Sequence, residues 1–206
     1  MEKDQFIQKL KDCPVITLIG PLFKGEMERL DHPHIFVDRG IIFQKDFHQK
    51  KQSGYWDFSV GDGDSSPLEL DLTLNPEKNF SDLSFALSLL PKNLKKLNLL
   101  GFLGGRRDHE LINLGEVHHS LLNNTLEAIV SLDGKILAKN GNLGVNIDGT
   151  FSLIVFNETE IKLRGELKYP LLEFTTIRPL SSHGLSNIGS GLINIESKGP
   201  YFIFLP

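Results

Sequence analysis

The chain has 206 residues, of which 40% are hydrophobic and 23% are charged, so it can bury a sizeable core and is not a disordered chain. Its formal net charge is −4 at pH 7, and acidic and basic residues are spread along the chain without a run of Lys or Arg. A nucleic-acid partner is therefore not expected.

Cysteine content and hydropathy indicate which cellular compartment to expect for the chain. The single cysteine, Cys13, cannot form an internal disulfide, which favours a reducing cytoplasm. No run of about 18 apolar residues is present, so no membrane span is expected. Residues 1–12 alternate charges with Phe6, Ile7 and Leu10, which predicts an amphipathic helix rather than a signal peptide.

From residue 14 to about residue 122, short apolar runs alternate with helical patterns, and most of the runs end in Gly or Asp. This alternation predicts an α/β domain, with a mostly parallel sheet and flanking helices. In such sheets the ligand lies beyond the carboxyl ends of the strands. The predicted strands are residues 15–19, 34–37, 58–60 and 97–100, and the predicted helices are residues 81–90 and 108–122.

From about residue 127 the pattern changes to short β-like stretches separated by turn residues, without a long helix. We therefore expect an all-β sandwich to follow the α/β domain, which places residues 1–125 in the first domain and residues 126–206 in the second. The predicted strands of the second domain are residues 128–132, 150–156, 161–163, 193–196 and 201–205.

The densest chemical signal is the turn Gly61-Asp62-Gly63-Asp64-Ser65-Ser66, directly after a predicted strand. Two carboxylates two residues apart can face one hard cation, such as the Mg²⁺ that accompanies a nucleotide. A calcium-binding EF-hand is disfavoured, because the twelfth position of a loop starting at Asp62 is Thr73 and not Glu. A plain solvated turn stays open, since Gly, Asp and Ser are ordinary turn residues.

Two helix starts carry further polar signals. Residues 101–109 form a glycine-rich turn between a strand and a helix, where Arg106 or Arg107 could bind phosphate, although the segment matches neither the dinucleotide fingerprint nor the P-loop. At residues 78–83, Ser81 is expected to be a helix N-cap, which leaves Lys78 and Asp82 for a site. An acid in the first turn of a helix also has a purely structural explanation, because it interacts favourably with the helix dipole.

Taken in order, these segments resemble the thiamine pyrophosphokinase family over most of the chain. The α/β half carries a G-D-x-D-S turn, a form of the K-D-x-T-D-L-x-x-A-L segment and a G-x-x-G-G-R-x-D-H loop, and the β half carries F-S-L-I, L-K-Y-P-L and a segment similar to S-x-G-I-S-N. They stand at residues 60–65, 77–87, 101–109, 151–154, 167–171 and 182–187.

The resemblance implies transfer of a diphosphoryl group from ATP to thiamine, with Mg²⁺, in a homodimer whose active site lies between the first domain of one subunit and the second domain of the other. Carried over by position, it implies the following sets of residues. Asp62, Asp64 and Asp82 would bind the metal and, with Arg106, form the catalytic set. Nucleotide and phosphates would contact Asp38, Ser65, Lys78, Gly104, Gly105, Arg106, Asp108 and His109. Thiamine would contact Tyr169, Ser186 and Asn187.

Two departures from the family pattern keep other functions open. Asn79 stands where the family has an Asp, and Arg39 stands in the segment that the family fills with A-D-G-G. The alternatives are a related diphosphotransferase acting on another hydroxymethyl heterocycle, such as a pterin, and a weakened member of the family that binds nucleotide or thiamine without turnover.

Overall fold

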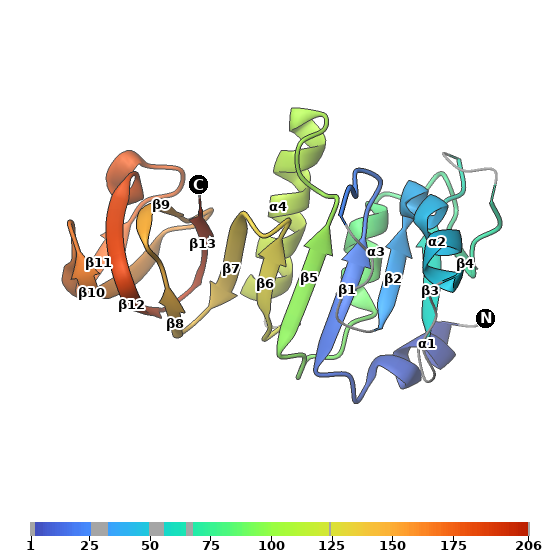
Figure 1. Cartoon of the computed structure of the whole chain (residues 1–206), viewed down its shortest axis with the longest axis horizontal. Coiled ribbons are helices and arrows are strands. Elements are labelled where there is room, and N and C mark those ends of the chain that lie inside the picture. The colour runs from blue at the N-terminus through green and yellow to red at the C-terminus, as the bar shows by residue number, and fades with distance from the viewer. Residues whose placement is uncertain (1–2, 26–32, 50–55, 65–67, 124, 206) are drawn as a thin grey trace.

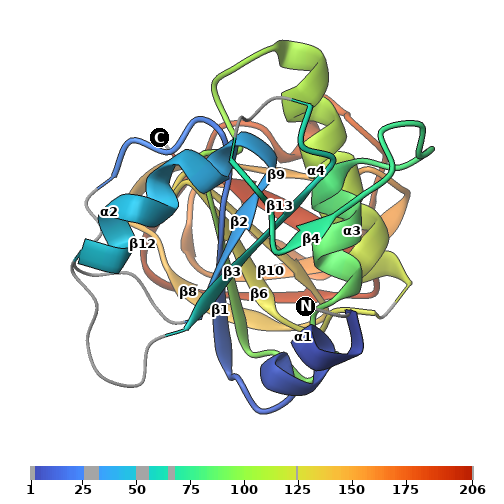
Figure 2. The ribbon, with the colours of Figure 1, turned by 90° about the vertical axis from the view of Figure 1, so that its right-hand side faces the viewer.

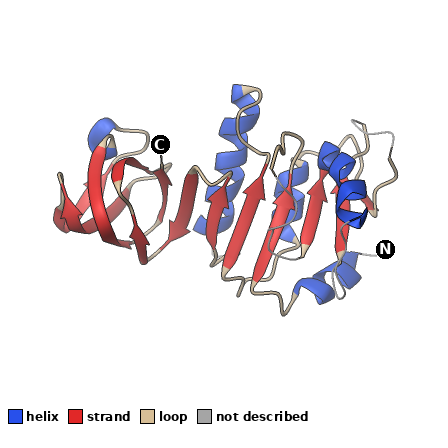
Figure 3. Ribbon diagram, viewed as in Figure 1, coloured by secondary structure: helices blue, strands red, loops and turns tan. Residues whose placement is uncertain are grey.

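The computed structural model describes residues 3–25, 33–49, 56–64, 68–123 and 125–205. In this part of the chain, thirteen strands form one mixed sheet in the order β11-β10-β12-β9-β13-β7-β6-β5-β1-β2-β3-β4, with β8 paired to β12 (Figure 1). Helices lie mainly at the β1–β6 end (Figure 3).

That end consists of β1 (Val15–Ile19), β2 (His34–Val37), β3 (Asp57–Gly61), β4 (Leu72–Thr73), β5 (Lys96–Leu100) and β6 (Ile129–Leu132). Its helices are α1 (Lys3–Leu10), the 3-10 helix η2 (Asp38–Phe43), α2 (Gln44–Gln49), α3 (Asp82–Ser88) and α4 (Arg107–Leu122). The other end consists of β7 (Ile136–Asn140), β8 (Leu143–Asn146), β9 (Gly149–Ile154), β10 (Thr159–Leu167), β11 (Leu171–Ile177), the 3-10 helix η3 (Ser182–Gly184), β12 (Asn187–Ser197) and β13 (Pro200–Phe204).

The parallel strands are covered on both faces, which explains why they are continuous apolar runs rather than alternating ones. One face carries a core in which Phe6 of α1, Leu83 of α3 and Val117 of α4 pack with strand residues. The other face carries a smaller core that includes Ile41 of η2 and Phe47 of α2. Figure 2 shows α2 on one side of the strands and α3 with α4 on the other. With both faces closed, the carboxyl edge of the strands is the surface left for a ligand.

The prediction of an α/β domain followed by a separate β sandwich is wrong. Strand β6 is parallel to β5 and antiparallel to β7, and hydrogen bonding continues from β7 to β13, with Ala138 opposite both Val130 and Phe202. The core does not stop there either, since Ile136, Ala138 and Phe202 belong to the same cluster as the residues of β1–β5.

The physical reason for this error is that a change of hydrophobic periodicity reports a change from parallel to antiparallel pairing, and not an end of the sheet. The outer strand β6 would otherwise leave a free edge, and β7 covers it through the turn at Asp133-Gly134. The division into residues 1–125 and 126–206 stays a prediction, because a shared sheet does not say which of its parts fold as units.

Candidate functional site

Three carboxylates meet at the carboxyl ends of β2 and β3. Asp38 follows β2 directly, with φ of 51°, and Asp62 and Asp64 follow β3. One carboxylate oxygen of each residue lies within 4.8 Å of those of the other two. Such a set of oxygen ligands fits a hard divalent cation, so the residues present suit the Mg²⁺ that the motifs predict.

Asp82, also predicted to bind metal, reaches the same place through a lysine. Lys78 Nζ lies 3.1 Å from Asp82 Oδ1 and also contacts Asp62 Oδ2, and the Lys78 side chain is only 7% exposed. Among the described residues, Asp82 is not a member of the three-carboxylate group. One ammonium group therefore links Asp62 and Asp82.

The ion pairs of Lys78 with Asp62 and Asp82 shift the pKa values of all three residues. The hydrogen bond from Lys78 holds the pKa of Asp62 below its ordinary value. Burial raises the pKa of Asp82, and Lys78 opposes that rise. Burial alone would lower the pKa of Lys78, but its hydrogen bonds to Asp62 and Asp82 outweigh that effect and raise it. Lys78 is therefore a cation at neutral pH and supplies positive charge beside the carboxylates.

The start of α3 fixes the position of this group. Ser81 Oγ accepts a hydrogen bond from Ser84 N at 2.9 Å, so the predicted N-cap is confirmed. Asp82 is then the first helical residue, and Lys78 lies four positions before it. Asn79, which departs from the family motif, is exposed and does not line the pocket described below.

The glycine-rich loop that joins β5 to α4 is held by a carboxylate from the next strand. Asp133, at the end of β6, accepts hydrogen bonds from the backbone N–H groups of Gly101, Phe102 and Leu103, the last at 2.8 Å. Gly101 has φ of 81°, and a Cβ at this position would stand 2.2 Å from Phe23 N, so only glycine fits. Asn113 Nδ2 donates to the Phe102 carbonyl at 2.9 Å. The loop is thus fixed before any ligand binds.

Asp133 is the residue that the sequence reasoning missed. Its signal was present, since it is an Asp directly after an apolar strand, as Asp38 and Asp62 are. In the sequence, Asp133-Gly134 follows the predicted strand at residues 128–132 and indicates only a turn. Their second role depends on β6 lying beside β5, which the pairing of residues 96–99 with residues 129–132 provides.

Arg106 and Asp108 form an exposed pair at the start of α4. Arg106 Nε donates to Asp108 Oδ1 at 3.1 Å, and its second guanidinium nitrogen contacts Asp108 Oδ2. The hydrogen bond from Arg106 lowers the pKa of Asp108 to about 2. Both side chains are more than half exposed, so the guanidinium can turn from its neighbour to an arriving phosphate.

A pocket of about 830 Å³ at the carboxyl edge joins these groups. The predicted residues that line it are Asp38, Asp62, Lys78, Asp82, Gly105, Arg106 and His109, and Arg39 lines it too. Asp64 belongs to the carboxylate group but does not line the pocket, and Asp108 does not line it either but pairs with Arg106, which does. Gly104 lines a neighbouring pocket. Ser65 lies outside the described residues.

The three residues predicted to contact thiamine lie together at the other end of the sheet. Asn187 Oδ1 accepts from Tyr169 N at 3.0 Å, and Asn187 Nδ2 donates to the Tyr169 carbonyl at 2.8 Å. Ser186, with φ of 56°, is bonded through its N–H to Ser152 Oγ. Neither pocket described for this chain includes any of the three. Strands β10, β11 and β12 lie at the opposite end of the sheet from β2 and β3, so within one chain these residues are far from the carboxylates (Figure 1).

Solved structures with a similar fold include thiamine pyrophosphokinases. The thiamine pyrophosphokinase from Bacillus subtilis has a TM-score of 0.69 and 22% identity, over 93% of this chain and 99% of that one. The enzyme from Geobacillus thermodenitrificans has a TM-score of 0.62 and 24% identity, over 92% and 95% of the two chains. The enzyme from Candida albicans has a TM-score of 0.67 and 13% identity, over 97% and 89%.

No family model and no curated protein matches the chain. No helix in the described ranges is both long and apolar enough to cross a membrane. At identities of 13% to 24%, structural likeness speaks for the fold. The resemblance inferred from the motifs is confirmed at that level, and the chain has the fold of the thiamine pyrophosphokinases.

Proposed function

We propose that the protein transfers a diphosphoryl group from ATP to thiamine and releases AMP. The observation that carries this proposal is the convergence of Asp62, Lys78 and Arg106 on one pocket at the carboxyl edge of a sheet with the thiamine pyrophosphokinase fold. The hydroxyl oxygen of thiamine forms a bond to the β-phosphorus, the bond from that phosphorus to the AMP oxygen breaks, and the hydroxyl proton goes to solvent.

The pocket residues have the chemistry that this reaction needs. Phosphoryl transfer depends on alignment of donor and acceptor and on neutralisation of phosphate charge. Lys78 and Arg106 both line the pocket and carry positive charge, and the first side chain is buried while the second is exposed. Asp38, Asp62 and Asp64 would hold Mg²⁺, which when bound neutralises charge on the phosphates.

The acceptor side of the proposal requires a second copy of the chain. Tyr169, Ser186 and Asn187 would contact thiamine from a partner subunit, which is the arrangement that the family resemblance implies. Support comes from the exposed apolar side chains of Leu172 on β11 and Leu192 on β12, which are 64% and 56% exposed. An apolar surface of this kind favours association of two proteins.

The direct test is an assay for AMP release with ATP, Mg²⁺ and a panel of acceptors that includes thiamine and a hydroxymethyl pterin. We expect AMP and thiamine diphosphate to form together, and only when thiamine and Mg²⁺ are both present. Asp62→Asn should lower kcat/KM by about a hundredfold or more, because it removes a charged ligand at the point of transfer.

Glu158→Gln is the matched control, because it removes one exposed acid at the other end of the sheet. It should leave kcat/KM unchanged. Transfer to the pterin but not to thiamine would contradict the proposal and favour the related diphosphotransferase. Binding of ATP and thiamine without any product would instead favour a family member without turnover.

A further inference from the structure

Phe80 is an exposed aromatic side chain at the wall of the pocket of about 830 Å³. Of the two phenylalanines that line this pocket, Phe102 is buried, whereas Phe80 is 43% exposed. Phe80 lies in the segment before α3 and belongs to none of the hydrophobic clusters of the described residues. The core of the protein therefore does not account for this ring, and part of its surface is open at the pocket.

Contacts on both sides hold Phe80 in place. Its ring stacks on that of Phe85, with centroids 5.9 Å apart and an interplanar angle of 18°. Phe85 is itself half-buried and packs against the main core. The ion pair between Lys78 and Asp82, at 3.1 Å, joins the residues two positions before and two positions after Phe80. The position of the ring is thus set by the folded chain, so a ligand that stacks on it orders little that was free.

The charge at the start of α3 is negative. Lys78 is shared between two carboxylates, those of Asp62 and Asp82. Glu116 of α4 is half-buried and accepts a hydrogen bond from Ser81 Oγ at 3.3 Å, and it forms no ion pair with the residues that the structure describes. Three carboxylates and one ammonium group therefore surround the segment, which favours a cationic ligand over an anionic one. The face of an aromatic ring attracts a cation as well.

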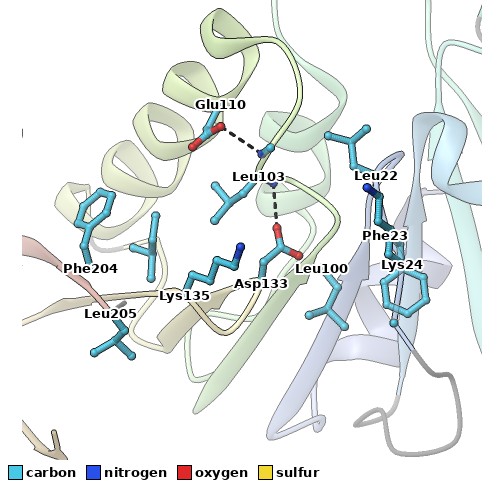
Figure 4. A pocket seen from close by; sticks show the side chains of 13 residues that line it. Leu22, Phe23, Lys24, Leu100, Leu103, Glu110, Asp133, Lys135, Phe204 and Leu205 are labelled. Atoms are coloured by element: carbon cyan, nitrogen blue, oxygen red, sulfur yellow. Dashed lines mark hydrogen bonds between the residues drawn. The ribbon is translucent and has the colours of Figure 1, made fainter. Parts of the chain in front are cut away.

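A neighbouring pocket, of about 640 Å³, shares Glu110 with the first pocket but has the opposite charge preference. Lys24 and Lys135 line it, and both of its acids are engaged with the backbone. Figure 4 shows Asp133 and Glu110 hydrogen-bonded to N–H groups of the β5–α4 loop. A cationic ring is therefore favoured at the start of α3 and disfavoured in the neighbouring pocket.

The proposed reaction needs the acceptor ring close to the carboxylates. In thiamine the attacking hydroxyl is carried by a short arm on the cationic ring itself, so this ring has to lie near the transferred phosphates. The attacking oxygen approaches opposite to the leaving oxygen, which places the acceptor and AMP on different sides of the phosphorus. Phe80, between Lys78 and Asp82, stands beside the carboxylates, where the acceptor ring is needed.

We propose that Phe80 selects the acceptor by stacking on the cationic ring of thiamine, within the same subunit whose carboxylates would hold the metal. Glu116 adds to this preference as a carboxylate without a cation of its own. The inference rests on the proposed function and deepens it, because it makes the positive charge of the acceptor ring the property that is recognised.

The test compares thiamine with an analogue in which a neutral thiophene ring replaces the thiazolium, at saturating ATP and Mg²⁺. Phe80→Leu keeps an apolar side chain but removes the aromatic face. The KM for thiamine should therefore rise about tenfold, while kcat and the KM for the neutral analogue stay within about twofold. Phe80→Trp, with a larger aromatic face, should lower the KM for thiamine relative to that for the analogue. Ile7→Ala is the control, because it changes an apolar side chain of similar exposure on α1 and should leave these values unchanged.

Circular dichroism establishes that each variant is folded, and if Phe80→Leu fails to fold, Phe80→Trp carries the test. An unchanged KM for thiamine in the folded variants would overturn the inference, as would an equal rise for both acceptors or a rise in the KM for ATP alone. In each of these outcomes the wild type still forms thiamine diphosphate, so the proposed function stands. A wild type that forms no thiamine diphosphate contradicts the proposed function, and calorimetric titration of wild type and Phe80→Leu with the two acceptors then decides the inference.

Discussion

At the parallel end of the sheet, helices cover both faces of β1, β2 and β3, whereas β12 at the antiparallel end buries Ile193 and Ile195 and leaves Ile188 and Leu192 in solvent. The parallel end therefore offers a ligand only the edge where its strands stop, and charged residues gather there. The antiparallel end offers a sheet face, and this face is partly apolar. The proposed function assigns charged phosphates to the first end, and a partner subunit and the acceptor to the second.

The largest difference in stability between variants of the two ends is expected from Lys78→Met. The change leaves Asp62 and Asp82 close together, with little exposure and without their cation, so the free energy of unfolding should fall by about 3 kcal/mol. Urea unfolding with and without Mg²⁺ measures this, and Mg²⁺ should restore part of the loss. Lys162→Met is the control at the antiparallel end, because Lys162 pairs at 3.7 Å with an exposed Glu173 and should contribute little. Equal losses in the two variants would contradict the account.

A smaller difference in stability is expected between variants of two aspartates that accept hydrogen bonds from backbone N–H groups. Asp133→Asn keeps the shape of the side chain but loses acceptor capacity for the β5–α4 loop, so stability should fall by about 1 to 2 kcal/mol and ATP affinity should fall with it. Asp148→Asn affects one bond, from Gly191 N, in an exposed turn of the antiparallel end. Calorimetric titration with ATP should show a change for the first variant alone. Normal ATP affinity in Asp133→Asn would mean that the loop does not hold the nucleotide.

The apolar face of the antiparallel end gives a third prediction. Leu192→Lys places a charge on the surface that a partner subunit would cover. The sedimentation coefficient should therefore fall to that of a monomer, and activity should fall with it. Leu111→Lys, which changes an equally exposed leucine on α4, is the control. Persistence of the dimer in Leu192→Lys, or a wild-type protein that is already monomeric, would remove the proposed interface.

The sequence predicts the secondary structure of the parallel end better than that of the antiparallel end. Residues 15–19 and 34–37 were predicted as strands and coincide with β1 and β2, because a strand buried on both faces is a bounded apolar run. The helix prediction at residues 108–122 is confirmed by α4. At the antiparallel end, β7, β8 and β11 were not predicted, since their residues are largely half-buried or exposed and show no clear apolar run.

The candidate site could likewise be predicted only in part from the sequence. The predicted group of Asp62, Lys78 and Asp82 is assembled largely by local sequence, because two of its members flank one helix start. The contribution of Asp133 depends on which strand lies beside β5, and the pairing of Asp38 with Asp62 depends on β2 lying beside β3. The order of strands in a sheet is a property of the whole fold, so the hydrophobic periodicity along the chain does not reveal which strands lie side by side.

The smallest predicted effect concerns His118, which is buried on α4 beside Phe156 and Phe202, where the two ends meet. Burial lowers its pKa, so the unfolded chain takes up a proton more readily than the folded one. Stability is then complete above the ordinary histidine pKa and declines as pH falls through it toward the lower folded pKa. Thermal unfolding of His118→Leu from pH 7 to pH 5 should show a weaker decline than the wild type. An unchanged pH dependence would mean that this histidine is not desolvated.

The central claim, that the carboxyl edge of the parallel end transfers a diphosphoryl group, is tested most directly by mass-spectrometric analysis of the products formed from ATP, thiamine and Mg²⁺. The account predicts thiamine diphosphate and AMP in equal amounts from the wild type and from Glu158→Gln, and about a hundredfold less from Asp62→Asn. Release of AMP without thiamine diphosphate, or equal product from Asp62→Asn, would contradict it.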